Sequence, residues 1–256
     1  MIQSQFSLQK NLRKRKCANN TKATEGVDPI RWQKGKIMNK KSVAQTKQEI
    51  TIPAISIAQV TFHIVGDSPL IMHAWSEKAK AMMLGKQTKK ATNGKEIRNP
   101  VREFVDSMYW LTEKPCPSIC DEEHHDELME VIAKSQFGFP ATAFKAAAVD
   151  GGFRSGAIPN KVSAFSAFHI DEEMIPITGT PIMREDMVRL GGISRAADLR
   201  YRGEFDDWSA TVTCTYNKNS ISAEQLANLF NLGGYACGLG EWRVEKGGEY
   251  GRFHVE

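Results

Sequence analysis

Glycine is concentrated near the end of the chain, where seven of the protein's 20 glycines fall within 19 residues. Glycine permits positive φ angles and lets another backbone approach closely. A glycine-rich segment that follows a helix can present backbone N–H groups to phosphate oxygens. The alternative is a long turn that only packs. The seven residues are Gly233, Gly234, Gly238, Gly240, Gly247, Gly248 and Gly251.

This segment matches neither of two common nucleotide-binding motifs. A Walker loop requires G-x4-G-K-[ST], which the sequence lacks. A dinucleotide fingerprint lies between a strand and the helix that follows it, whereas this segment is expected to follow a helix and precede a strand. We expect no bound cofactor.

A second group of chemically capable residues is the string Cys116, Cys120, His124 and His125. Its C-x3-C-x3-H-H spacing is sterically possible for zinc. A polar surface loop is the alternative, because zinc knuckles usually have C-x2-C spacing and an acidic helix start follows. The chain has five cysteines, and an odd number in a cytosolic protein indicates free thiols.

The 256-residue chain has a formal net charge of +4, which is unevenly distributed. Residues 1–50 carry a balance of +9 and residues 51–256 a balance of −5. Any polyanion site in the larger part must therefore be a local patch and not a global field. The basic run at residues 13–16 could touch nucleic acid, although such runs are usually just solvated.

Residues 1–50 lack hydrophobic periodicity, and we expect them to form a disordered basic leader. Residues 34–38 could be encoded by a purine-rich stretch before an ATG, which makes Met38 a candidate for the true start. A flexible basic tail is the alternative. The sequence has no run of 18 apolar residues and no secretory signal pattern, so we expect a cytoplasmic protein without a membrane span.

Hydrophobic patterns place strands and helices along residues 51–256. Period-2 alternation predicts strands at 50–65 and 208–216. Shorter strands are expected at 165–170, 174–177 and at the end of the chain. Helices are expected at 76–84, 100–111, 121–135, 137–150 and 222–232, the last with a capping box at Ser222 and Gln225. We expect Gly151 and Gly152 to end the helix that contains Pro140.

These elements predict an α+β fold. Without its insertions, the order is β-α-β-β-α-β, which is a ferredoxin-like arrangement. The insertions are a helical one at about residues 86–136 and an arginine-rich one at about 178–206. We therefore expect a single domain over residues 51–256.

The last part of the chain resembles a known family. Residues 222–232, then Gly238-Leu-Gly-Glu-Trp-Arg243 and Tyr250-Gly-Arg-Phe253, resemble the C-terminal helix, glycine-rich loop and last strand of the RAMP superfamily, and most of all its crRNA-coating CRISPR backbone subunit. Residues 55–255 also look like a family of uncharacterised phage and prophage proteins. The matching segments are 65–71, 139–145, 183–189, 199–205 and the C-terminal block.

The resemblance implies an RRM- or RAMP-type core with a thumb-like β-excursion at residues 182–205. It implies non-catalytic binding of single-stranded DNA or RNA in a bacterial host, as a homo-oligomer or filament. Arginine forks suit phosphates, and aromatic rings stack on bases. The alternative is that the arginines pair with Glu185, Asp186, Asp198 and Glu204. The candidate binding residues are Arg184, Arg189, Arg195, Arg200, Arg202, Tyr201, Lys145, Gly238, Gly240, Trp242, Arg243 and Lys246.

Two other functions stay open. Some RAMP relatives cut RNA with a histidine, and His73, after the first strand, is a weak candidate for metal-independent cleavage; His63 and His169 are the other histidines considered. No Ser-His-Asp, H-E-x-x-H or Walker motif supports other hydrolase chemistry. The second alternative is a self-assembling phage structural protein that binds no nucleic acid.

Overall fold

The structure is a computed structural model that describes residues 52–75, 77–88, 98–189 and 196–256. The chain divides into two compact units, Met1–Thr51 and Ile52–Glu256. The predictions of a disordered leader and of a start at Met38 lie outside the described residues, as do Cys17 and Arg195. No helix in the described ranges is long and apolar enough to cross a membrane.

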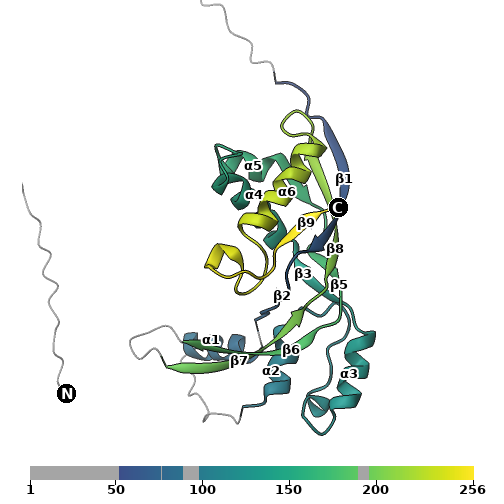
Figure 1. The fold of residues 1–256 in the computed structure, drawn as a ribbon, viewed down its shortest axis with the longest axis vertical. Coiled ribbons are helices and arrows are strands. Elements are labelled where there is room, and N and C mark those ends of the chain that lie inside the picture. Colours follow the sequence, from purple (N-terminus) through teal and green to yellow (C-terminus); the bar gives the residue numbers. More distant parts are fainter. Residues whose placement is uncertain (1–51, 76, 89–97, 190–195) are drawn as a thin grey trace, which may run out of the picture. The chain divides into compact units, whose positions relative to one another are not determined.

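The second unit has the predicted α+β class, with two antiparallel sheets and helices packed beside them (Figure 1). The main sheet has the strand order β3-β5-β8-β1-β9, and β4 also pairs with β8. Its strands are β1 (Ile57–Gly66), β3 (Phe137–Pro140), β4 (Phe168–Ile170), β5 (Met174–Thr178), β8 (Ser209–Asn217) and β9 (Phe253–Val255).

Strand β1 shows why this sheet has one buried face. Phe62 and Ile64 are buried, whereas Thr61 and His63, which alternate with them, are exposed, as the pattern predicts. The Phe62 ring packs 5.6 Å from the ring of Phe230, centroid to centroid. The buried face therefore holds an aromatic core, and the opposite face is open and polar.

Three helices lie together on one side of the main sheet (Figure 1). They are α4 (Ala141–Arg154), α5 (Lys161–Ala167) and α6 (Ala223–Ala236). The predicted capping box at Ser222 and Gln225 starts α6, as expected. The aromatic core lies between these helices and the sheet, since Phe144 and Phe230 are fully buried.

The predicted helix ends at the paired glycines are wrong. Helix α4 continues through Gly151 and Gly152, and α6 continues through Gly233 and Gly234. A Cβ on Gly151 would lie 2.6 Å from the Cα of Gly233, and one on Gly233 would lie 2.7 Å from the Cα of Ala148. The glycines therefore let the backbones of α4 and α6 touch.

Several other boundaries differ from the prediction, and two of them have a clear tertiary cause. Residues 137–140 form strand β3 before α4 begins, because Phe137–Pro140 pairs with β5 in the main sheet. Residues 165–167 belong to α5, which Asn160 caps through its side chain, and β4 begins at Phe168. In both places a tertiary contact overrides the local pattern.

The second sheet has the order β2-β7-β6 and contains the expected excursion. Strands β6 (Ile182–Arg189) and β7 (Ala197–Phe205) pair to form the β6–β7 hairpin, and β2 (Leu70–Ile71) pairs with the base of β7. Helix α2 (Pro100–Ser107) packs against β7. The remaining elements are α1 (Glu77–Gln87), α3 (His125–Lys134) and the short 3-10 turns η1 (Pro117–Ile119) and η2 (Val244–Lys246).

Candidate nucleic-acid interface

The glycine loop, residues 237–251, packs closely against its surroundings. Gly240 has φ +74°, and a Cβ there would overlap the carbonyl oxygen of Ile71 in β2. The amide of Gly238 donates to the carbonyl of Gly233, and that of Gly251 donates to the carbonyl of Pro69. Much of the loop's backbone therefore bonds within the protein, and the amide of Gly238 is not presented to a ligand.

Trp242 stands out within this loop. It is the one non-glycine residue with positive φ (+52°) in the described part of the chain. Its side chain remains 40% exposed, so it is not the packing anchor that a tryptophan between glycines usually is. Left-handed backbone at a non-glycine residue costs free energy and tends to occur where function requires it.

His73 and Glu241 form a hydrogen-bonded pair between β2 and the glycine loop. His73 Nδ1 lies 2.6 Å from Glu241 Oε1. The bond from His73 lowers the pKa of Glu241, so this carboxylate is ionised at neutral pH. An ionised carboxylate only accepts, so Nδ1 carries a proton, and Nε2 is an acceptor when the imidazole is neutral.

A pocket of about 220 Å³ opens beside this pair, and we call it the His73 pocket. Helix α4, the glycine loop and Tyr109 enclose it. Burial raises the pKa of Tyr109, as does the nearby charge of Glu241, and its hydroxyl donates to the carbonyl oxygen of His73 at 3.4 Å. The pocket brings together four sequence-predicted residues, which are His73, Gly238, Gly240 and Arg243.

The two loop cations are held by one carboxylate. Arg243 Nε lies 2.9 Å from Glu245 Oε2, and Arg243 Nη1 donates to the carbonyl oxygen of Gly240. Lys246 lies 3.8 Å from Glu245 Oε1, and Arg154 from α4 reaches the same oxygen at 3.2 Å. Arg243 therefore has little capacity left for a ligand, whereas Lys246 is mostly exposed.

Helices α4 and α5 carry a patch of lysines beside exposed aromatic rings, which we call the α4–α5 patch. Lys145 Nζ lies 5.9 Å from the ring centroid of Phe165, and Lys161 Nζ lies 5.1 Å from that of Phe153. Both phenyl rings are exposed, at 39% for Phe165 and 45% for Phe153. Such cation–ring pairs are compatible with a base stacked on the ring and a phosphate on the ammonium.

Lys145 and Lys161 differ in their anionic partners. Lys161 Nζ lies 2.7 Å from Asp150 Oδ1, a residue that also lines the His73 pocket. Lys145 has no carboxylate partner among the described residues, and burial lowers its pKa. The patch is thus continuous with the pocket through Asp150 and contains one lysine without an anion.

The arginines of the β6–β7 hairpin are mostly neutralised within the hairpin. Arg184 donates to Asp186 and Glu204, at 2.8 Å in each case. Arg202, whose side chain is 7% exposed, lies 3.3 Å from Asp186. The Arg184 guanidinium also stacks 4.6 Å above the ring of Tyr250 in the glycine loop. Arg184 thus links the hairpin to the loop, and both arginine side chains are largely buried.

The other hairpin candidates are more exposed. Arg200 pairs with Asp198 at 2.9 Å and is 40% exposed. Arg189, at the end of β6, has no ion-pair partner among the described residues. Glu185 accepts a hydrogen bond from Tyr201, which raises the pKa of Tyr201. By the register of β6 and β7, Arg184, Arg200 and Arg202 share one face of the hairpin, where carboxylates pair with all three, and Arg189 lies on the other face.

The cysteine–histidine string is not assembled into a metal site. Cys120 is buried and its thiol donates to the carbonyl oxygen of Cys116, while Cys116 is exposed. His124 bonds to Asp121 at 2.7 Å, and His125 lies beside Asp126. Across residues 52–75, 77–88, 98–189 and 196–256, no three histidine, cysteine, aspartate or glutamate side chains are grouped so that they could hold a metal.

Two histidines considered from the sequence lie away from the pocket. His63 and His169 are on the open face of the main sheet, with His63 Nε2 3.8 Å from Glu256. Sequence reasoning missed other residues at the site. Glu241 is 168 positions from His73, so no local pattern links them. The other missed residues are Tyr109, Asp150, Phe153, Lys161 and Phe165.

No protein-family model matches the chain, and no curated protein matches it. Among solved structures, the chain is similar to Cmr6 from Pyrococcus furiosus, with 11% sequence identity and a TM-score of 0.29. The match covers 79% of this chain and 100% of that one. A TM-score this low does not establish a common fold.

Proposed function

We propose that the protein binds single-stranded nucleic acid across the helical side of the main sheet. The ligand passes over the α4–α5 patch and the mouth of the His73 pocket. The observation that carries this proposal is the pairing of exposed phenyl rings with lysine ammonium groups at Phe165 and Phe153. Sequence-tolerant binding of single strands uses this combination of stacking surface and cation.

Two exposed indoles extend the stacking surface. Trp242 directly follows Glu241, and Trp75 lies two residues after His73. Each residue of the hydrogen-bonded pair therefore has an indole close to it in the sequence. Trp75 is 63% exposed. Exposed aromatic side chains near a cation are the usual platform for unpaired bases.

The arrangement of the main sheet supports a ferredoxin-like interpretation. We take β1 as the first core strand, β4 and β5 together as the second, β8 as the third and β9 as the fourth, with α4 and α6 as the two helices. The order of these core strands across the sheet is then two-three-one-four. All neighbouring pairs are antiparallel. The β6–β7 hairpin then occupies the position expected for a thumb. A RAMP relationship, a phage origin and an oligomeric or filamentous form remain predictions from the resemblance.

The direct test is a binding titration of the full chain by fluorescence anisotropy. Labelled single-stranded RNA, single-stranded DNA and duplex are compared at several salt concentrations, and we expect salt-dependent binding of single strands. Phe153→Ala and Phe165→Ala should each weaken binding by about fivefold to a hundredfold, because one stacked base contributes about 1–3 kcal/mol. Ile57→Ala is the matched control, since Ile57 is an exposed apolar residue on the open face of the sheet.

The outcomes separate the alternatives. Equal affinity in folded Phe153→Ala, Phe165→Ala and Ile57→Ala would show that the patch does not bind the ligand. If no oligonucleotide binds and the protein assembles equally well after nuclease treatment, the structural-protein alternative replaces this proposal.

RNA cleavage is a second candidate, and the His73–Glu241 hydrogen bond favours it. With Nδ1 bonded to Glu241, Nε2 could accept the proton of an RNA 2′-hydroxyl. The 2′-oxygen would then attack phosphorus, and the proton would return to the departing 5′-oxygen. To test this, the labelled RNA used in the titration is incubated with the protein and a metal chelator. Cleavage of RNA but not of DNA, lost in the His73→Ala variant, would establish the activity.

A further inference from the structure

The His73 pocket has an apolar buried lining and a polar lining at its mouth. Phe139, Ala147 and Leu239 are buried, whereas Asp150 and Glu241 are partly exposed. Its volume of about 220 Å³ is below the range of about 300–1,000 Å³ that is typical for drug-sized ligands. The pocket is therefore sized for one small group, such as a single planar ring system.

Most of the side-chain donors that line this pocket are already used. The Arg243 guanidinium is bonded to Glu245 and to the carbonyl of Gly240. The hydroxyl of Tyr109 donates to the carbonyl of His73, and Nδ1 of His73 donates to Glu241. An incoming group thus meets few free N–H or O–H donors.

The acceptors are not all used. Glu241 Oε2 and Asp150 Oδ2 accept no hydrogen bond from any described residue, since His73 and Lys161 occupy only the other oxygen of each carboxylate. His73 Nε2 is a third acceptor in the tautomer that Glu241 selects. A phosphate or carboxylate would face repulsion here, so the pocket fits a group that presents N–H donors.

We propose that the His73 pocket receives one unpaired nucleobase of the bound strand and prefers guanine. This rests on the proposed function and assigns base recognition to a site beside the binding surface. The Watson–Crick edge of guanine carries two adjacent N–H donors, so one can bond to the free oxygen of Glu241 and the other to a neighbouring acceptor of the pocket. Adenine and cytosine offer one amino group on that edge, and uracil places carbonyl oxygens on both sides of its single N–H.

The exposed rings of Trp242 and Trp75 favour a base over a protein side chain as the occupant. Arginine is also planar and rich in donors, so it is the competing ligand. An extruded base, however, needs stacking surfaces for its neighbours in the strand, and these two indoles lie within two residues of the His73–Glu241 pair.

The test compares labelled oligouridine with the same strand carrying one central guanosine, adenosine or cytidine, bound to the full chain. One guanosine should raise affinity about tenfold, since a bidentate contact to a base contributes about 1–3 kcal/mol of discrimination. Adenosine and cytidine should have smaller effects. Anisotropy titrations at one fixed salt concentration give the ratios.

Two variants locate the discrimination. Glu241→Gln replaces an acceptor oxygen by a donor amide, and Ala146→Leu fills the pocket without a change of charge. Each should remove the preference for guanosine. Thr142→Leu is the control, because Thr142 is exposed on the same helix and does not line the pocket. If Glu241→Gln does not fold, Ala146→Leu still tests the pocket.

The outcomes distinguish this inference from the proposed function. If oligouridine binds and guanosine adds nothing, the base pocket is wrong while single-strand binding stands. If no strand binds, both fail. Acetylarginine amide is tested as a competing ligand by its effect on indole fluorescence. If it quenches the fluorescence of the wild type but not of Ala146→Leu, and guanosine quenches neither, the pocket is a peptide site and the proposal is overturned.

Discussion

The β6–β7 hairpin and the α4–α5 patch both carry cations, but their neighbours differ. In the hairpin, Arg184 and Arg202 are surrounded by Asp186 and Glu204, which are themselves nearly buried. In the patch, Lys145 lies over phenyl rings and has no carboxylate partner among the described residues. The hairpin arginines are satisfied internally, whereas in the patch Lys161 is paired with Asp150 and only Lys145 lacks a described carboxylate partner.

This difference shows that the number of basic residues in a segment does not locate a binding surface. The hairpin is richer in arginine than α4 and α5, yet its arginines fix the position of the glycine loop through the stacking of Arg184 on Tyr250. The nearest carboxylate decides whether a cation is structural or free. Each prediction below changes one side of this comparison.

The largest expected effect is on stability. Arg184→Ala should lower the free energy of unfolding by about 3 kcal/mol, because it leaves the nearly buried Glu204 without a cationic partner. Chemical denaturation measures the change. Arg189→Ala, at the exposed end of β6, should change it by less than about 0.5 kcal/mol. A stable Arg184→Ala with weakened nucleic-acid binding would instead place Arg184 in the interface.

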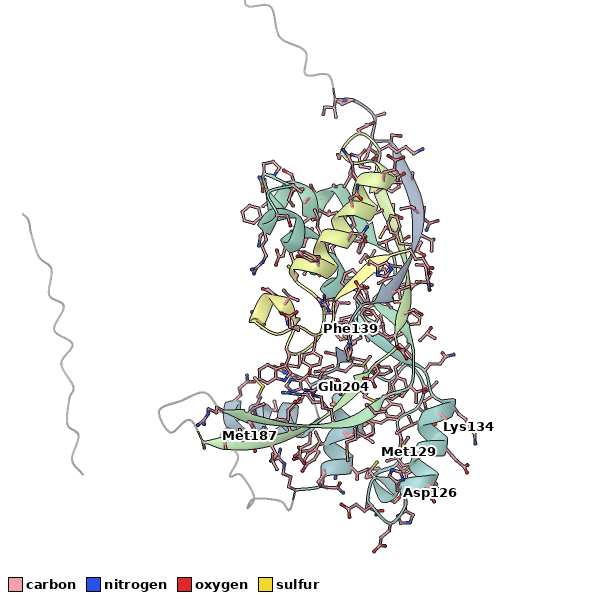
Figure 2. The ribbon with its side chains drawn as sticks, in the orientation of Figure 1. Asp126, Met129, Lys134, Phe139, Met187 and Glu204 are labelled. Carbon is pink, nitrogen blue, oxygen red and sulfur yellow. The ribbon has the colours of Figure 1, made fainter. Side chains whose placement is uncertain are left out.

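A smaller effect is expected on the salt dependence of binding. Lys145→Gln with Lys161→Gln should reduce the slope of log affinity against log salt by about 1.4, at about 0.7 for each lost phosphate contact. The control is Lys134→Gln, which removes one charge from the exposed end of α3, away from α4 and α5 in Figure 2. An unchanged slope in the double variant would mean that the patch lysines do not contact phosphates.

The smallest effect is on pH dependence. Burial lowers the pKa of Lys145, so the free protein loses this charge before an ordinary lysine would as pH rises. Affinity should therefore fall, by less than about tenfold, between neutral pH and the ordinary lysine pKa of about 10.4. Lys145→Arg should remove that part of the decrease, because arginine stays charged.

The same titration predicts an opposite change in stability. Between the lowered pKa of folded Lys145 and its ordinary value, the unfolded chain binds more protons, so stability from this residue increases with pH. Denaturation at two alkaline pH values, in wild type and in Lys145→Arg, compares the two trends. Parallel curves in both proteins would contradict the assignment.

The α+β class and several elements could be predicted from local pattern. Strands β1 and β8 alternate cleanly, and the capping box at Ser222 marks the start of α6. The continuation of α4 and α6 through Gly151 and Gly233 could not be predicted, because those glycines are required by contact between two helices far apart in the sequence. A local rule treats such glycines as helix breakers.

The site was only partly predictable for the same reason. Sequence identified His73, Lys145 and the glycine loop as chemically capable. It could not show which arginines were already paired, since Arg184 and Glu204 are 20 positions apart and meet across a strand register. Nor could it show that Phe153 lies on the last turn of α4, beyond the glycines expected to end that helix.

The contact of α4 with α6 at Gly151 and Gly233 leaves no space for even one methyl group. Tightly packed backbones have no room to slide past each other, so the two helices should move as one body. The glycine loop starts where α6 ends, and the lysine patch begins on α4. A displacement of the α4–α5 patch would therefore be passed to the start of the glycine loop, so the proposed binding surface and the proposed base pocket are mechanically coupled.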